Sequence, residues 1–105
     1  MKKIYNKLVR DKIPEIIERD GKKCVTKVLL HEQYIAALDS KLDEELAEYH
    51  SEPCVKELAD LLEVIHAVAA ARDYGVEKLE QVRAEKAERR GGFEKRLLLK
   101  EVIEE

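Results

Sequence analysis

Two short acidic motifs follow one another near the middle of the chain. Glu45 and Glu48 lie three residues apart, and so do Glu57 and Asp60. On an α-helix, residues at i and i+3 are neighbours on one face, with Cβ atoms about 5–6 Å apart. Carboxylates held so close repel one another unless a cation lies among them. Two such pairs on adjacent antiparallel helices would bring four carboxylates together, which is the oxygen-rich environment that suits Mg²⁺ or Mn²⁺.

The helical positions of these carboxylates favour a site over a surface decoration. At about 100° per residue, Glu45 falls about 20° outside the apolar arc of its helix, and Glu48 lies further round. Glu57 falls inside the apolar arc of the next helix, between the directions of Val64 and Val68. A charged carboxylate in that direction is costly unless it is paired or binds a metal. On spacing alone, a solvated acidic face or pairing with Lys or Arg remains an alternative.

Composition is typical of a helical globular domain. The 105 residues are 45% hydrophobic and 41% charged, with four Gly, two Pro and no Trp. This balance favours amphipathic helices in a single domain spanning residues 1–105, and argues against disorder or a strand-rich sandwich. No apolar run resembles a signal peptide or reaches transmembrane length. Cys24 and Cys54 form no Cys-x-x-Cys pair, so we expect a reduced, cytoplasmic protein.

Charge is distributed unevenly along the chain. Residues 1–23 carry eight Lys or Arg against four Asp or Glu, whereas residues 31–63 carry ten acidic residues against two basic ones. A basic start beside an acidic middle suits a site that holds a metal on one side and an anion on the other. Simple attraction between the two segments explains the same pattern equally well.

Apolar periodicity and helix breakers predict one short and three long helices. The short helix contains Pro14 in its first turn. The long helices are expected over about residues 31–50, 53–74 and 76–90. The second long helix is apolar nearly all round, which predicts a central position.

Residues 24–30 are β-branched and apolar enough for a short strand. Residues 96–102 can form either a strand that pairs with residues 24–30 or a final helix, and we favour the strand. The predicted fold class is therefore mainly α: a bundle of about four helices with one small two-stranded element.

Basic side chains give a complementary signal. Lys86 and Arg90 lie on the helix expected over residues 76–90, and such a row can contact a polyphosphate bridged to a metal. Cations near a helix C-terminus are also favoured by the helix dipole without any ligand. Lys7 and Arg10 form a second basic cluster, which can likewise either contact a phosphate or be present without any ligand.

With these residues in view, the chain resembles the all-α nucleotide pyrophosphohydrolases, the MazG-like and phosphoribosyl-ATP pyrophosphohydrolase-like group. The hallmark of that group is Glu-Glu-x-x-Glu followed by Glu-x-x-Asp on the next helix, which residues 44–48 and 57–60 match. Residues 5–14, Tyr-Asn-Lys-Leu-Val-Arg-Asp-Lys-Ile-Pro, and the Lys…Arg-Gly-Gly-Phe of residues 86–93 also look like a small-protein branch of the group. The resemblance thus covers nearly the whole chain, as a MazG-like helical bundle.

The resemblance implies roles for two sets of residues. The carboxylates that would bind Mg²⁺, or Mn²⁺ instead, and carry the catalysis are Glu45, Glu48, Glu57 and Asp60. The basic residues that would contact phosphates are Lys86, Arg90, Lys7 and Arg10.

The implied reaction is the hydrolysis of a nucleoside triphosphate, or a related nucleotide, to the monophosphate and pyrophosphate. Two alternatives are phosphoribosyl-ATP hydrolysis in histidine biosynthesis and a non-catalytic helical interaction module. The group generally forms homodimers or homotetramers of packed helices. We expect no nucleic-acid partner, because residues 31–63 are strongly acidic, and no membrane partner.

Overall fold

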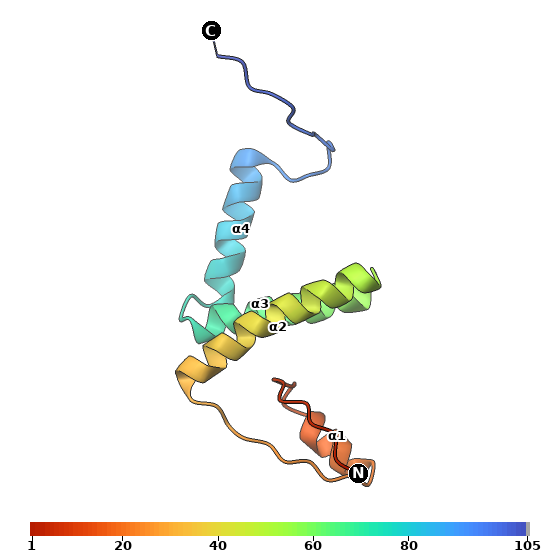
Figure 1. Cartoon of the computed structure of the whole chain (residues 1–105). Coiled ribbons are helices and arrows are strands. Elements are labelled where there is room, and N and C mark those ends of the chain that lie inside the picture. Colours follow the sequence, from red (N-terminus) through yellow and green to blue (C-terminus); the bar gives the residue numbers. More distant parts are fainter. Residues whose placement is uncertain (105) are drawn as a thin grey trace.

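The computed structural model describes residues 1–104, which fold into four α-helices (Figure 1). They are α1 (Ile13–Arg19), α2 (His31–Ser51), α3 (Val55–Ala71) and α4 (Val76–Arg90). The predicted mainly α class is confirmed, and each long helix lies where its periodicity placed it, with small shifts at the ends. No helix among the described residues is sufficiently long and apolar to cross a bilayer.

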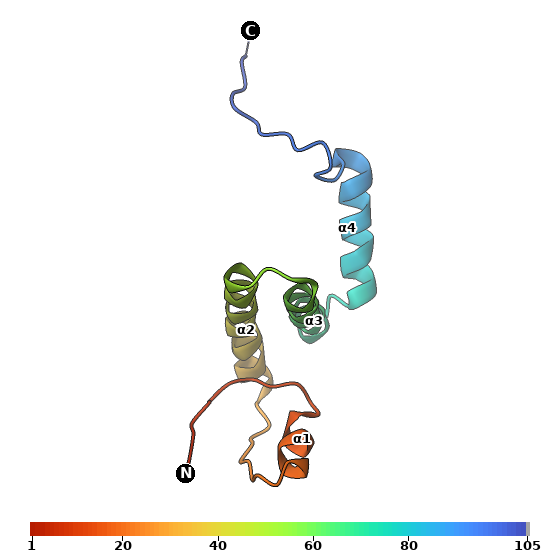
Figure 2. The ribbon, with the colours of Figure 1, turned by 90° about the vertical axis from the view of Figure 1, so that its right-hand side faces the viewer.

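A tight turn folds α2 and α3 into an antiparallel hairpin, whose two helices lie side by side (Figure 2). The backbone N–H of Glu52 donates to the carbonyl of Glu48 at 3.0 Å, which closes the last turn of α2. Pro53 has no N–H to continue a helix. Cys54 is extended (φ −159°, ψ 166°), so α3 begins at Val55. The hairpin places the two acidic motifs opposite each other.

A second turn ends α3 and directs α4 away from the hairpin. The N–H groups of Tyr74 and Gly75 both donate to the carbonyl of Ala69 at 3.0 Å. Gly75 has a φ of +82°, a conformation that side chains disfavour. From there α4 leaves the hairpin at a steep angle, so that its later turns stand clear of α2 and α3 (Figure 1).

Little of the chain is buried. Among residues 1–104, the buried apolar residues are Leu38 and Ala69, each 3% exposed. α3 contacts both α2 and α4, as its expected central position requires. The single chain does not enclose it, because α2 covers one face of α3 and Leu58 and Leu62 remain about half exposed. The apolar character of α3 therefore exceeds what its own chain covers.

The predicted pair of strands is wrong: residues 1–104 contain no strand. Residues 24–30 form an extended link between α1 and α2, and residues 96–102 lie in the segment after α4. Figure 1 shows these segments at opposite ends of the molecule. An extended segment needs a neighbouring strand to pair its backbone groups, and the steep exit of α4 removes that neighbour.

Candidate metal centre

Three carboxylates meet where α2 packs on α3. Glu45 comes from α2, and Glu57 and Asp60 come from successive turns of α3. One oxygen atom of each lies within 4.8 Å of those of the other two. These three residues are called the acidic cluster below. The cluster joins both sequence motifs, so the predicted meeting of the two acidic pairs holds for three of the four residues.

Burial makes the acidic cluster unusual. Glu45 is 7% exposed, and it is the one charged or polar residue that is buried among those described. The Oε2 atoms of Glu45 and Glu57 are shielded from solvent and have no hydrogen-bond partner within residues 1–104. A buried carboxylate oxygen without a donor carries a desolvation cost of about 1–3 kcal/mol or more. Two residues of one cluster each carry such an oxygen, which suits the cluster to a cation.

The pKa of Glu45 reflects the same burial and lack of partners. Burial raises the pKa of the Glu45 carboxyl, and the negative charges of Glu48 and Asp60 raise it further. Lys41, one helical turn earlier, opposes the shift with its Nζ 3.5 Å from Glu45 Oε1. The net pKa shift remains upward, so one nearby lysine does not fully compensate the carboxylate.

Glu48 stands apart from the cluster. It is exposed and offers no ligand atom within the 4.8 Å group. Its effect on the pKa of Glu45 shows that its charge is still close. The predicted role of Glu48 as a fourth ligand is therefore not built into this arrangement of the chain, although it remains at the edge of the site.

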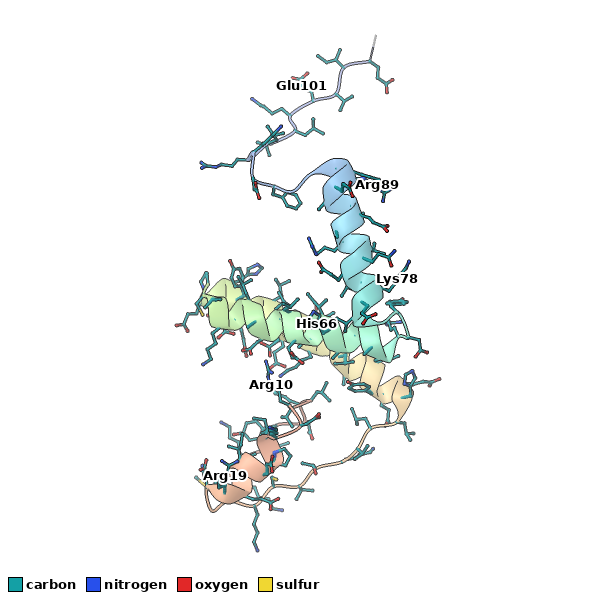
Figure 3. The ribbon with its side chains drawn as sticks, turned by 180° about the vertical axis from the view of Figure 1, so that it is seen from behind. Arg10, Arg19, His66, Lys78, Arg89 and Glu101 are labelled. Atoms are coloured by element: carbon teal, nitrogen blue, oxygen red, sulfur yellow. The ribbon has the colours of Figure 1, made fainter. Side chains whose placement is uncertain are left out.

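The N-terminal arm (residues 1–12) brings two predicted basic residues to the acidic side of the hairpin. Arg10 Nη2 lies 2.8 Å from Asp60 Oδ1, and Lys7 Nζ lies 3.0 Å from Glu44 Oε1. Figure 3 shows Arg10 pointing at the hairpin from the arm. The contacts join residues 50 and 37 positions apart. The basic start and the acidic middle of the chain thus meet at one site.

Lys41, which the sequence did not single out, also belongs to this site, together with Glu44 of the Glu-Glu-x-x-Glu motif. The hydrogen bond from Lys7 and a second one from Lys41 at 3.3 Å lower the pKa of the Glu44 carboxyl. The hydrogen bond to Glu44 raises the pKa of Lys7 in turn. The spacing of Lys41, at i−3 from Glu44 and i−4 from Glu45, could have indicated both contacts.

The other two predicted phosphate contacts lie far from the cluster. Lys86 and Arg90 are exposed on the later turns of α4, beyond the point where α4 leaves the hairpin (Figure 3). Neither forms an ion pair with any described residue. One chain therefore assembles Lys7 and Arg10 beside the carboxylates, but not Lys86 and Arg90.

The donor set fits a hard divalent cation. All three cluster ligands are carboxylates, with no His or Cys among them, and Mg²⁺ is bound through few carboxylates together with water and phosphate oxygens. The two unpartnered oxygens point to the same conclusion. Glu45, Glu57 and Asp60 would hold such an ion, and Arg10 would release Asp60 as it binds.

Comparisons with known proteins do not assign the chain to a family. No family model matches it, and no solved structure matches it. The chain is 56% identical over 41 residues to an uncharacterized protein of Mycolicibacterium smegmatis. That match covers 39% of this chain and 42% of the relative.

Proposed function

We propose that the chain is a Mg²⁺-dependent nucleotide pyrophosphohydrolase, which hydrolyses a nucleoside triphosphate or related nucleotide to the monophosphate and pyrophosphate. The observation that supports it best is the pair of buried, unpartnered carboxylate oxygens of Glu45 and Glu57, two residues that each place one carboxylate oxygen within 4.8 Å of an oxygen of Asp60. Mn²⁺ would bind in the same way. The order of the motifs along the chain, on which the family resemblance depends, supports the nucleotide as substrate.

A bound Mg²⁺ supplies charge neutralisation at phosphate oxygens and makes a water molecule more acidic. Glu45, Glu57 and Asp60 hold the ion by this proposal. Water adds to the phosphorus atom that stays with the nucleoside. The bond from this phosphorus to the bridging oxygen breaks, and pyrophosphate leaves with that oxygen. The water gives up its proton to a carboxylate of the chain.

The chain offers two neighbouring carboxylates as this base, Glu44 and Glu48. Lys7 and Lys41 lower the pKa of Glu44, which makes its carboxylate a weaker base. Glu48 forms no ion pair with the described residues and lies beside Glu45. We therefore assign the proton to Glu48, which keeps the catalytic role that the sequence motif implied for it.

Arg10 and Lys7 supply positive charge beside the acidic cluster. Both already pair with carboxylates there, at 2.8 and 3.0 Å. When a cation takes Asp60, the Arg10 guanidinium becomes free for a phosphate, for which its planar, two-pronged geometry is suited. The same pairs favour a second candidate, a non-catalytic helical module whose carboxylates serve only to fix the N-terminal arm.

The test is pyrophosphate release from a panel of nucleotides with and without Mg²⁺. Glu57→Gln is expected to abolish Mg²⁺-dependent release, because it removes a ligand charge while keeping side-chain size. Glu63→Gln is the matched control, since Glu63 is an exposed residue of the same helix. Unchanged activity in Glu57→Gln would refute the metal site. Activity confined to phosphoribosyl-ATP would select the histidine-biosynthesis enzyme, and absence of release from every nucleotide would favour the interaction module.

The proposal includes a cytoplasmic location and a homodimer or homotetramer. Cys24 and Cys54 are both free, which suits a reducing compartment. No nucleic-acid or membrane partner is part of the proposal.

A further inference from the structure

Lys41 differs from the other basic residues of the site because its side chain is largely withdrawn from solvent. It is 20% exposed, whereas Lys7 and Arg10 are 50% and 59% exposed. The Nζ of Lys41 lies 3.5 Å from Glu45 Oε1 and 3.3 Å from Glu44 Oε1. A Lys four residues before a Glu is the less favourable order for an ion pair along a helix. Helix stability therefore gives little reason for a lysine at this position.

The two carboxylate oxygens of Glu45 have different surroundings. Oε1 lies against the ammonium group of Lys41, and Oε2 is buried without a hydrogen-bond partner among residues 1–104. A cation that binds Oε2 alone leaves the contact between Oε1 and Lys41 intact. A Ca²⁺ ion that binds both oxygens must come within about 2.3–2.6 Å of Oε1, which already has the ammonium group 3.5 Å away. Because like charges at such range repel, the site favours one oxygen of Glu45 over two.

Lys41 cannot give way to a cation as easily as Arg10 can. Arg10 belongs to the N-terminal arm, and its contact with α3 joins residues 50 positions apart. Lys41 lies one helical turn before Glu45 on α2, so the helix itself keeps them close. Glu44 also accepts a 3.3 Å hydrogen bond from the ammonium group, and the same Glu44 oxygen accepts one from Lys7 at 3.0 Å. The lysine is therefore retained when a cation enters the site.

The number of oxygens that each carboxylate offers distinguishes between divalent cations. Ca²⁺ takes about six to eight oxygen ligands in a flexible arrangement, in which a carboxylate can supply both of its oxygens. Mg²⁺ is smaller, requires a nearly ideal octahedron and keeps several water molecules. A carboxylate that is limited to one oxygen therefore suits Mg²⁺ and disfavours Ca²⁺.

We propose that Lys41 determines which cation the acidic cluster accepts: it holds Oε1 of Glu45, leaves one oxygen of that carboxylate for the metal, and thereby selects Mg²⁺ over Ca²⁺. This role rests on the proposed function, because it requires a cation at the acidic cluster. Lys41 acts through Glu45 and is a positioning residue. The three carboxylates alone, each free to offer two oxygens, would not have this preference.

The test compares Lys41→Met with wild type in their affinities for Mg²⁺ and Ca²⁺, each measured by competition with Mn²⁺ in an electron paramagnetic resonance titration without nucleotide. Met keeps an unbranched apolar side chain and removes the charge. The preference for Mg²⁺ over Ca²⁺ should fall about 10-fold or more, because Glu45 can then bind Ca²⁺ through both oxygens. Lys41→Arg keeps the positive charge and should retain most of the preference. Lys78→Met removes the same charge from an exposed position on α4 (Figure 3) and should match wild type.

Infrared spectroscopy measures how the carboxylates bind the ion. The gap between the antisymmetric and symmetric stretches of a carboxylate narrows when both of its oxygens bind one metal. In the spectral change caused by adding Ca²⁺, Lys41→Met should show one more carboxylate with the narrowed gap than wild type does. With Mg²⁺ the two proteins should give the same change. A role of Lys41 in packing alone would not produce this difference between the two cations.

An unchanged ratio of the two affinities in Lys41→Met, or an equal change in both affinities, would overturn the role of Lys41 in selection. Wild type that binds Ca²⁺ as tightly as Mg²⁺ would overturn it as well, whether or not any variant folds. Wild type that binds neither cation would refute the metal site and, with it, the proposed function. Mg²⁺ binding without pyrophosphate release from any nucleotide would refute the proposed reaction alone, and the affinities would still decide the role of Lys41.

Discussion

Glu57→Gln is expected to change the stability of the chain in opposite directions with and without metal. Glu57 forms no ion pair with any described residue, and its Oε2 is buried without a hydrogen-bond partner in that part of the chain. Its ligand oxygen lies within 4.8 Å of those of Glu45 and Asp60. Without a cation, this carboxylate adds repulsion and desolvation cost, and the neutral amide relieves both.

The magnitude follows from the 4.8 Å separation. Coulomb's law gives about 1 kcal/mol for each like-charge contact at the dielectric constant of water and about 3.5 kcal/mol at an effective value of 20. Arg10 beside Asp60 and Lys41 beside Glu45 reduce the repulsion, so we take the lower part of this range. Metal-free Glu57→Gln should be more stable than wild type by about 1–2 kcal/mol, which corresponds to a rise in Tm of about 4–8 °C.

Magnesium should reverse this order. A ligand that binds only the folded state at 100 times its Kd stabilises it by about 2.7 kcal/mol. Wild type should gain this stabilisation, and Glu57→Gln should lose most of it because one of three ligand charges is gone. With saturating Mg²⁺, wild type becomes the more stable protein.

The assay is thermal unfolding followed by circular dichroism, in EDTA and across a Mg²⁺ titration, at one fixed protein concentration. Glu63→Gln changes the net charge by the same amount on the same helix and should follow wild type in both conditions. If Glu57→Gln is destabilised in EDTA, the carboxylate is already satisfied in the chain and the reasoning fails. If both proteins respond equally to Mg²⁺, the ion binds elsewhere.

Three further predictions address the rest of the site. Because burial raises the pKa of Glu45, metal-free Glu45→Gln should be more stable than wild type at neutral pH. The difference in unfolding free energy should vanish as the pH falls through the raised pKa and below 4.5. A difference in urea denaturation that stays constant with pH would contradict this. Arg10→Gln frees Asp60, so the affinity for Mn²⁺ without nucleotide should rise roughly two- to five-fold in an electron paramagnetic resonance titration. The KM for nucleotide should also rise. Weaker Mn²⁺ binding would contradict competition between Arg10 and the metal. The pKa of Glu44 is lowered and that of Lys7 is raised, so any stabilisation by their pair is present above pH 4.5 and is lost as the pH falls through the Glu44 pKa. At the alkaline end, the stabilisation is present below pH 10.5 and is lost as the pH rises through the Lys7 pKa. A stability difference between wild type and Lys7→Ala that persists at both extremes would show that Lys7 acts through packing.

The helices could be read from the sequence because their causes are local. Apolar spacing set the extent of α2 and α3, while Pro53 and Gly75 fixed where they break. The i, i+3 spacing of Glu57 and Asp60 placed both carboxylates on one face before any packing was known. The hairpin was predicted in the same way. Pro and Gly are absent from the interiors of its two helices, and only a short turn separates the acidic motifs.

What each helix face meets depends on contacts between residues far apart in the chain. The helical wheel placed Leu46 in the apolar arc and Glu45 outside it, yet Leu46 is 43% exposed and Glu45 is 7% exposed. A small rotation of α2 against α3 decides between two adjacent positions, and no local propensity encodes it. The sequence therefore determined that carboxylates gather between these helices. Only the packing decided that Glu45, and not Glu48, enters the cluster.

The pairing of Arg10 with Asp60 was likewise decided by tertiary structure, since it joins residues 50 positions apart. Charge composition showed that the two segments would attract, but the partner of each cation depends on the path of the N-terminal arm. The predicted strand pair was wrong for the same reason. Residues 24–30 and 96–102 have local strand character, but the direction of α4 separates them (Figure 1). Local propensity selects an element within a few residues, whereas pairing between elements depends on the geometry of every turn that connects them.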